Sequence, residues 1–275
     1  MAQVIECDPR NFLERAGAWL EREPVLHNVL CTVVHRAIRN PAPFGDARWF
    51  VLEEDGEPVG SAMLTPPFPL TLTPMPTRHL HDLADTLAAC LPQLRGVSGP
   101  DDVAGRFAEL WAARTGVAVE HGMDQLMYAL DTVVPAPSAD GKLRPAEAAD
   151  RQLLCDWVDA FVREVGGVSG DIAGMVDYRL ATGGLYLWEH TDVVTLAGVT
   201  PAVAGVVRVG PVYTPPEARR RGYATSCVAA VSQQALDAGA SACMLFTDKA
   251  NPTSNSIYQR IGYRLVATAS EYRFR

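Results

Sequence analysis

An arginine-rich segment carries the residues whose types and spacing most clearly suggest chemistry. Residues 212–224 read VYTPPEARRRGYA, so an apolar strand end breaks at two prolines and reaches Gly222 where a helical pattern begins. Such a turn leaves backbone N–H groups unpaired at the helix N-terminus, where the macrodipole adds about half a positive charge. Gly222 lets the main chain approach a ligand closely, and Arg219 to Arg221 offer guanidinium forks. These residues by themselves predict a phosphate-binding turn.

The order of these residues is more specific than their chemistry. Arg219-x-x-Gly222-x-Ala224, preceded by a strand and Pro216, resembles the acetyl-CoA signature of the GNAT superfamily of N-acyltransferases. A second match follows, because residues 251–263 (NPTSNSIYQRIGY) resemble the later strand-to-helix segment of the same superfamily. The resemblance implies an α/β fold with a mixed central sheet flanked by helices. It also implies direct transfer of an acetyl group from acetyl-CoA to a primary amine, with no metal and no covalent enzyme intermediate.

The same resemblance implies a set of contacts with coenzyme A. Main-chain groups at Val212 and Thr214 would pair with the pantetheine amides as an added strand does, and the diphosphate would lie on the N–H groups of residues 220–225. Two members of the set have competing structural roles, since Tyr213 can simply pack and Asn251 suits the N-cap of a helix that begins at Pro252. The expected cofactor-binding residues are Val212, Tyr213, Thr214, Arg219, Arg220, Arg221, Gly222, Tyr223, Ala224, Thr225, Asn251 and Asn255.

Proton transfer needs an acid and a base. The resemblance implies that Tyr258 is the general acid, because a phenol near the sulfur can protonate the departing thiolate; otherwise a buried tyrosine packs in the core.

The attacking amine must be neutral, yet the strand VVRVG before the turn carries no acid where some relatives have a glutamate. Glu164 is favoured as the base, because it lies at the helix-to-helix loop that borders the acceptor cleft in such folds. Arg208 could instead recognise a carboxylate on the acceptor. The other candidate bases are Asp171, Glu189, His190 and Glu271.

The elements that must position these residues fall into two similar halves. Helices are expected within residues 11–38, 79–91, 103–114, 146–165, 172–182 and 226–238, and strands within 49–64, 125–130, 143–145, 184–199, 204–214, 242–246 and 264–274. The proline-rich stretch 65–76 could hold one more strand, LTLT. With a constant shift of 135 positions, residues 50–66 lie over residues 185–201, and both end in Thr-Pro. This match predicts a domain-sized repeat, in which Trp111 stands about where Tyr258 falls once a gap is allowed.

The repeat predicts a division of the chain into two tandem GNAT-like copies. Residues 1–135 would form a copy without the cofactor motif, serving as a scaffold or a wall of the substrate cleft. Residues 136–142 would form a linker, and residues 143–275 the catalytic domain.

Composition narrows the class of partner. The formal charge of −8 argues against a nucleic-acid binder, which needs a basic surface. No apolar run reaches the length of a bilayer span and the first twenty residues carry charges, so we expect a cytoplasmic protein. The six cysteines stand singly without metal-ligand spacing, which predicts reduced thiols and no metal. The expected partner is a small-molecule or peptide amine, with the protein a monomer or homodimer that binds neither nucleic acid nor membrane.

Two other interpretations fit the same residues. The protein could bind or sense acyl-CoA without turnover, or it could use a longer acyl-CoA as the donor. Release of free CoA thiol in the presence of amines separates the first interpretation from catalysis, and the depth of the acyl pocket decides the second.

Overall fold

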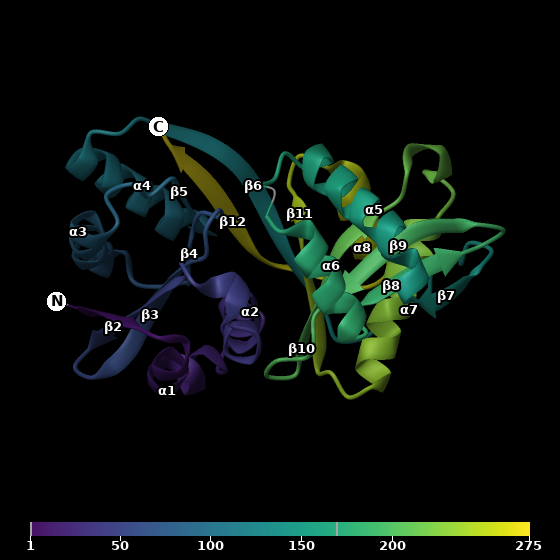
Figure 1. The fold of residues 1–275 in the computed structure, drawn as a ribbon, viewed down its shortest axis with the longest axis horizontal. Coiled ribbons are helices and arrows are strands. Elements are labelled where there is room, and N and C mark those ends of the chain that lie inside the picture. Colours follow the sequence, from purple (N-terminus) through teal and green to yellow (C-terminus); the bar gives the residue numbers. More distant parts are fainter. Residues whose placement is uncertain (1, 169) are drawn as a thin grey trace. The chain divides into compact units, whose positions relative to one another are not determined.

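The chain folds into two compact units, each built from a sheet and helices (Figure 1). The computed structural model describes residues 2–168 and 170–275. Unit 1 comprises Met1–Leu126 and Ala267–Arg275, and unit 2 comprises Met127–Val266. None of the described helices has both the length and the apolar character that crossing a membrane requires.

Unit 1 contains a mixed sheet with the strand order β1-β2-β3-β4-β5-β12. Its strands are β1 (Gln3–Cys7), β2 (Arg48–Glu54), β3 (Glu57–Leu64), β4 (Leu70–Leu72), β5 (Gly96–Pro100) and the end of β12 (Arg264–Phe274). The helices are α1 (Pro9–Leu20), α2 (Asn28–Arg39), α3 (Leu80–Cys90) and α4 (Asp101–Thr115). Trp49 of β2 contacts Phe12 of α1, whereas Phe50 packs in a core with α3 and α4. Alternate residues of the strand therefore face helices on opposite sides of the sheet.

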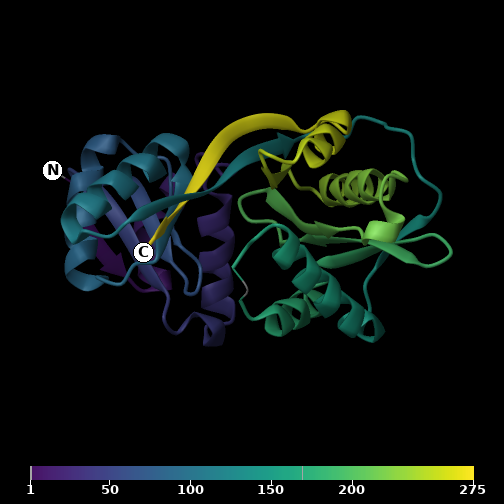
Figure 2. The ribbon, with the colours of Figure 1, turned by 90° about the horizontal axis from the view of Figure 1, so that it is seen from above.

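Unit 2 contains a second mixed sheet, with the strand order β6-β11-β10-β9-β8-β7. Its strands are the end of β6 (Val119–Leu130), β7 (Lys142–Pro145), β8 (Leu185–Glu189), β9 (Val193–Val199), β10 (Val206–Tyr213) and β11 (Ala242–Asp248). The helices are α5 (Arg151–Glu164), α6 (Ile172–Ala181), α7 (Tyr223–Asp237) and α8 (Pro252–Arg260). Figure 2 shows α5 and α6 on one face of this sheet and α7 and α8 on the other. The turn from β10 into α7 thus lies at one end of a helix-covered sheet.

The two units repeat the same order of elements. Each has an antiparallel hairpin with a register shift close to its turn, between Leu52 and Glu53 in unit 1 and between Trp188 and Glu189 in unit 2. Each then has a parallel pair, β4 with β5 and β10 with β11. The predicted α/β fold in two tandem copies is confirmed.

The last strand of each copy is exchanged between the units. β6 follows α4 in the chain but lies beside β11, and β12 follows α8 but pairs with β5 over Ala269–Arg273. The sequence expectation ended the first domain at residue 135 and kept the C-terminus in the second, whereas the structure assigns residues 267–275 to unit 1. The hydrogen bonds between β5 and β12 are the physical reason for this difference.

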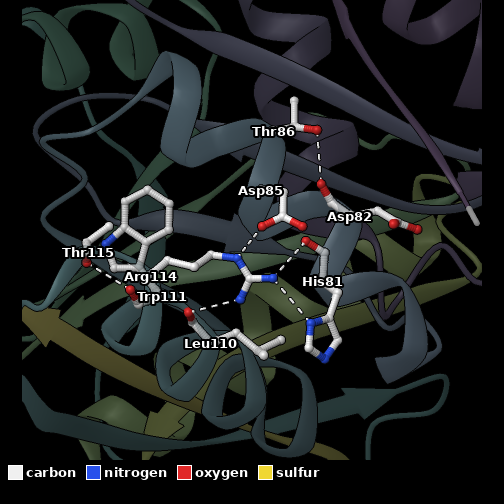
Figure 3. Close-up of polar contacts among 8 residues, drawn as sticks. All are labelled: His81, Asp82, Asp85, Thr86, Leu110, Trp111, Arg114 and Thr115. Carbon is white, nitrogen blue, oxygen red and sulfur yellow. Dashed lines mark hydrogen bonds and ion pairs between the residues drawn. The ribbon is translucent and has the colours of Figure 1, made fainter.

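Trp111 of unit 1 has a packing role. Its ring stacks between Phe107 and Phe274, at centroid distances of 5.8 and 6.0 Å, and its indole N–H is buried without an acceptor among the described residues. Three residues later, Arg114 fastens α4 to α3 through Asp85 and His81, and it also donates to the Leu110 carbonyl (Figure 3). The helix of unit 1 that corresponds to α8 is therefore held by structural contacts.

Most expected elements are present, and two strands escaped prediction. The segment that forms β1 is only five residues long, and β5 has the sequence GVSGP, whose glycines and proline are typical of a turn. β6 also begins at Val119, six residues before the strand expected at 125–130. These strands depend on neighbours far away in the sequence, and local pattern carries little trace of them.

Candidate functional site

The turn between β10 and α7 wraps tightly because two of its residues have left-handed backbone conformations. After β10 the chain passes through a short 3₁₀ turn at Pro216–Ala218 and enters α7 at Tyr223. Arg220 has φ +63° and Gly222 has φ +85°. Glycine adopts the left-handed region without the steric cost that a Cβ imposes, so Gly222 suits the N-cap position that it occupies. We call residues 219–225 the cradle.

The cradle exposes a run of unpaired backbone donors. The N–H groups of residues 220–225 have no hydrogen-bond acceptor within the described part of the chain. The first helical bond runs from the Ser226 N–H to the Gly222 carbonyl at 3.0 Å, and no side chain of the described residues caps the helix. Six consecutive free donors at the start of a helix of 15 residues form a site for an anion. The side chains of Arg220 and Arg221 are exposed, and neither makes an ion pair with any described residue.

The side chain of Arg219 makes contacts with other residues of unit 2. Its Nε donates to the Thr214 carbonyl at 2.9 Å, and its Nη2 lies 2.7 Å from Oε2 of Glu164 at the end of α5. The hydrogen bond to Glu164 raises the pKa of Arg219. Its guanidinium also lies 5.8 Å from the ring centroid of Tyr213, which itself contacts Trp157 of α5. Arg219 thus connects the end of β10 to the end of α5, and Tyr213 has the packing role that was its alternative.

β10 separates from β11 before it reaches the cradle. The parallel pairing runs from Val206 with Ala242 to Arg208 with Met244 and then stops. Among the described strands, the rest of β10 pairs with β9, across a register shift between Val209 and Val212. Pro211 within this stretch has no N–H to contribute to a ladder. The predicted splaying of this strand is confirmed, and it leaves β10 open on its β11 side at Val212.

Tyr258 lies in α8 and is 9% exposed. Its ring centroid is 6.0 Å from that of Tyr263, and its hydroxyl has no hydrogen-bond partner among the described residues. Burial raises the pKa of Tyr258 well above its usual value, and nearby Cys227 adds to the rise. The phenol therefore remains protonated at neutral pH, as a proton donor must.

The two asparagines have structural partners. Asn251 accepts a hydrogen bond from the Ser254 N–H at 3.1 Å, so its side chain caps α8. Asn255 accepts from the Thr247 hydroxyl and donates to the carbonyls of Asp248 and Lys249 at 3.4 Å each. Both side chains hold the loop between β11 and α8 in place.

The candidate bases all have partners or other roles. Glu164 pairs with Arg219, and Glu189 lies 2.9 Å from Arg144. Asp171 caps α6 through the Gly174 N–H at 2.9 Å. The remaining two candidates are His190, whose ring lies 6.1 Å from that of Tyr223, and Glu271, which pairs with Arg273 in unit 1. Of the five, Glu164 is joined to the cradle directly.

A cavity of about 310 Å³ lies beside the cradle, and sequence reasoning did not find it. Ala139, in the connection between β6 and β7, donates its N–H to the Ser226 hydroxyl at 2.8 Å, and the Asp140 carbonyl accepts from the Trp188 indole at 3.1 Å. These bonds hold this connection across the start of α7. The cavity is lined by residues 133–138 and by Trp188, Thr225, Ser226, Ala229, Ala230 and Gln233. One sign of this cavity is present in the sequence, namely the prolines in the segment that connects β6 to β7.

Comparison with known proteins identifies a matched segment and the fold of the chain. Residues 190–273 match the family model described as FR47-like protein. No curated protein matches the chain in a comparison of sequences. Solved structures match over nearly the full length. A GNAT-family acetyltransferase from Colwellia psychrerythraea is 10% identical, with 99% of this chain and 100% of that chain covered and a TM-score of 0.64.

Two further solved structures have a similar fold over nearly the full length of the chain. A GCN5-related N-acetyltransferase from Sphaerobacter thermophilus is 15% identical, with 98% of this chain and 95% of that chain covered and a TM-score of 0.61. A tandem GNAT protein from the clavulanic acid biosynthesis pathway is 11% identical, with 99% and 98% covered and a TM-score of 0.60. The GNAT fold implied by the resemblance is thereby confirmed, and residues 190–273 within it match the family model.

Proposed function

We propose that unit 2 is an N-acetyltransferase that binds acetyl-CoA at the cradle and passes the acetyl group directly to a primary amine. The observation that carries this proposal is the run of six unpaired N–H groups in residues 220–225. A diphosphate placed there would receive hydrogen bonds from donors already in position, and the helix dipole would favour its charge. Arg220 and Arg221 are free to add guanidinium contacts.

The pantetheine arm is proposed to lie in the opening between β10 and β11. Main-chain groups near Val212 and Thr214, apart from the Thr214 carbonyl that accepts from Arg219, would offer the arm the hydrogen bonds of an added strand. This placement brings the thioester back along β10, where an N–H near Val212 would polarise its carbonyl. The side chains of Asn251 and Asn255 support this site by shaping the loop that precedes α8.

The chemical step requires two proton transfers. The amine nitrogen attacks the acetyl carbon, the C–S bond breaks, and Tyr258 gives its proton to the departing thiolate. The amine loses a proton to Glu164, directly or through water. Glu164 is paired with Arg219 in the free protein, and a diphosphate bound at the cradle would compete for Arg219. Positioning of the two reactants supplies much of the acceleration.

The remaining parts of the chain are given supporting roles. Unit 1 is proposed as a scaffold without a cofactor site, since the segment after its hairpin lacks the R-x-x-G-x-A order. Residues 136–142 are proposed as a linker that also forms one wall beside the cradle. The protein is proposed to work in the cytoplasm as a monomer or homodimer on a small-molecule or peptide amine.

The test is release of free CoA thiol from acetyl-CoA in the presence of a panel of primary amines, with calorimetric titration of CoA alongside. Binding accompanied by amine-dependent thiol release supports the transferase. Binding of CoA without thiol release across the panel would favour an acyl-CoA sensor. Absence of CoA binding would refute the cradle as the coenzyme A site. Replacing acetyl-CoA with longer acyl-CoA donors tests which length of acyl chain the protein transfers.

A further inference from the structure

Arg208 presents a cation on the α5–α6 face of the unit 2 sheet. Leu196 of β9 belongs to the apolar cluster that α5 and α6 form with the sheet. Side chains alternate along a strand, so Val199 points to the opposite face, and so does Val209, with which it pairs. Arg208 precedes Val209 and therefore faces the α5–α6 side.

The Arg208 guanidinium has no counterion within the described part of the chain. Its backbone N–H donates to the Thr200 hydroxyl at 3.0 Å, but its side chain has no hydrogen-bond or ion-pair acceptor among the residues that the structure describes. The side chain is partly buried, and loss of water around it lowers the pKa of Arg208 to about 10. A cation withdrawn from water without a partner is unfavourable, and an anionic ligand would relieve that cost.

Arg208 also stands at the inner end of the opening in the sheet. It pairs with Met244, and this is the last pair before β10 and β11 separate. Val212 lies four residues further along, which at about 3.3 Å per residue corresponds to ~13 Å. The pantetheine arm proposed to run from the cradle past Val212 would therefore point its acyl end toward Arg208.

We propose that Arg208 binds a carboxylate of the acceptor, so that the substrates are amino acids or similar amines with a carboxylate a few bonds from the nitrogen. This inference rests on the proposed function. The planar guanidinium matches a carboxylate with two parallel hydrogen bonds, which fixes the orientation of a small molecule as well as its position. With the carboxylate held at Arg208, the amino group is left to face the thioester. Arg208 is thus a specificity-determining residue and takes no part in proton transfer.

The experiment compares amino acids with their primary amides, which keep the amine and remove the negative charge. Glycine, β-alanine, γ-aminobutyrate, glutamate and lysine form the panel. The wild-type protein should use the best carboxylate about 10- to 100-fold more efficiently in kcat/KM than its amide, mainly through KM. Arg208→Met should bring this ratio close to one and leave activity on amides and the affinity for CoA unchanged. Arg208→Lys, which keeps a point charge, should retain part of the preference, and Arg151→Met on the exposed start of α5 is the matched control.

A second measurement needs no turnover. Calorimetric titration of the CoA-bound protein with N-acetyl amino acids and with their N-acetyl amides compares product-like ligands directly. Tighter binding of the carboxylates in the wild type, lost in Arg208→Met, supports the proposal. Equal binding of the two ligand classes, or a preference that survives Arg208→Met, overturns it. If the carboxylate ligands bind more tightly through Arg208 but no amine releases thiol from acetyl-CoA, the proposed transferase activity is refuted. The proposed carboxylate site at Arg208 is then still supported.

Discussion

Replacement of Tyr258 by phenylalanine separates proton donation from every other role of this residue. Tyr258 is 9% exposed and its ring centroid lies 6.0 Å from that of Tyr263, so phenylalanine preserves its packing. The hydroxyl makes no hydrogen bond to the described residues, so its removal leaves no protein partner unpaired. The change in unfolding free energy should therefore stay within about 1 kcal/mol.

The effect on catalysis should be much larger than the effect on stability. A positioned general acid contributes roughly 10²- to 10⁴-fold, and at 1.36 kcal/mol for each factor of ten this is about 2.7 to 5.4 kcal/mol of transition-state stabilisation. Because burial raises the pKa of Tyr258, the donor form persists as pH rises. The wild-type kcat should accordingly show no decline from phenol ionisation between pH 7 and about pH 9, below the usual tyrosine pKa of about 10.

The assay measures kcat at saturating acetyl-CoA and amine, and the CoA dissociation constant by calorimetry, for both proteins. We expect kcat to fall at least about 100-fold while the dissociation constant changes less than about 2-fold. A Tyr258→Phe variant with wild-type kcat would remove the phenol from the mechanism. A loss of affinity equal to the loss of rate would show that Tyr258 binds the cofactor and does not donate a proton.

Three further predictions concern the base, the thiols and the exchanged strands. Glu164→Gln should lower kcat by about 10²-fold or more, yet tighten CoA binding slightly, because Arg219 loses an exposed ion pair worth at most ~1 kcal/mol; an unchanged kcat in steady-state assays would exclude Glu164 as the base. In the folded protein at pH 8, a thiol reagent should modify exposed Cys90 and spare Cys227, because burial raises the pKa of Cys227 to about 12. Rapid labelling of Cys227, measured by mass spectrometry, would contradict its buried position. Separately expressed halves cut within residues 136–142 should lack native circular dichroism until mixed, because each sheet takes its last strand from the other half; two independently folded halves would argue against the exchange.

The cradle could be predicted from sequence because its determinants are local. Pro216 stops β10 from continuing, Gly222 permits the left-handed turn, and the helical pattern begins directly afterwards. All three features lie within eight residues, so no tertiary information was needed. The same holds for the hairpin turn at Asp55 and Gly56, whose φ angles of +54° and +81° suit these residue types.

The rest of the site depends on contacts that no local pattern encodes. The ion pair of Glu164 with Arg219 joins residues 55 positions apart, and either residue alone resembles an ordinary surface charge. The face on which Arg208 lies follows from its register against β9, which the sequence does not fix across a bulge. The exchange of β6 and β12 could not be predicted because it depends on pairs far apart in sequence, such as Ala269 with Pro100.

The most direct test of the account is calorimetric titration of CoA into the wild type and two variants of Gly222. Gly222→Ala and Gly222→Glu both place a Cβ at φ +85°, so they share the backbone strain and differ in bulk and charge. We predict that Gly222→Ala retains measurable CoA binding, and that Gly222→Glu abolishes it in a protein that still unfolds cooperatively. Wild-type affinity in Gly222→Glu would contradict the claim that the N–H groups of residues 220–225 hold the diphosphate.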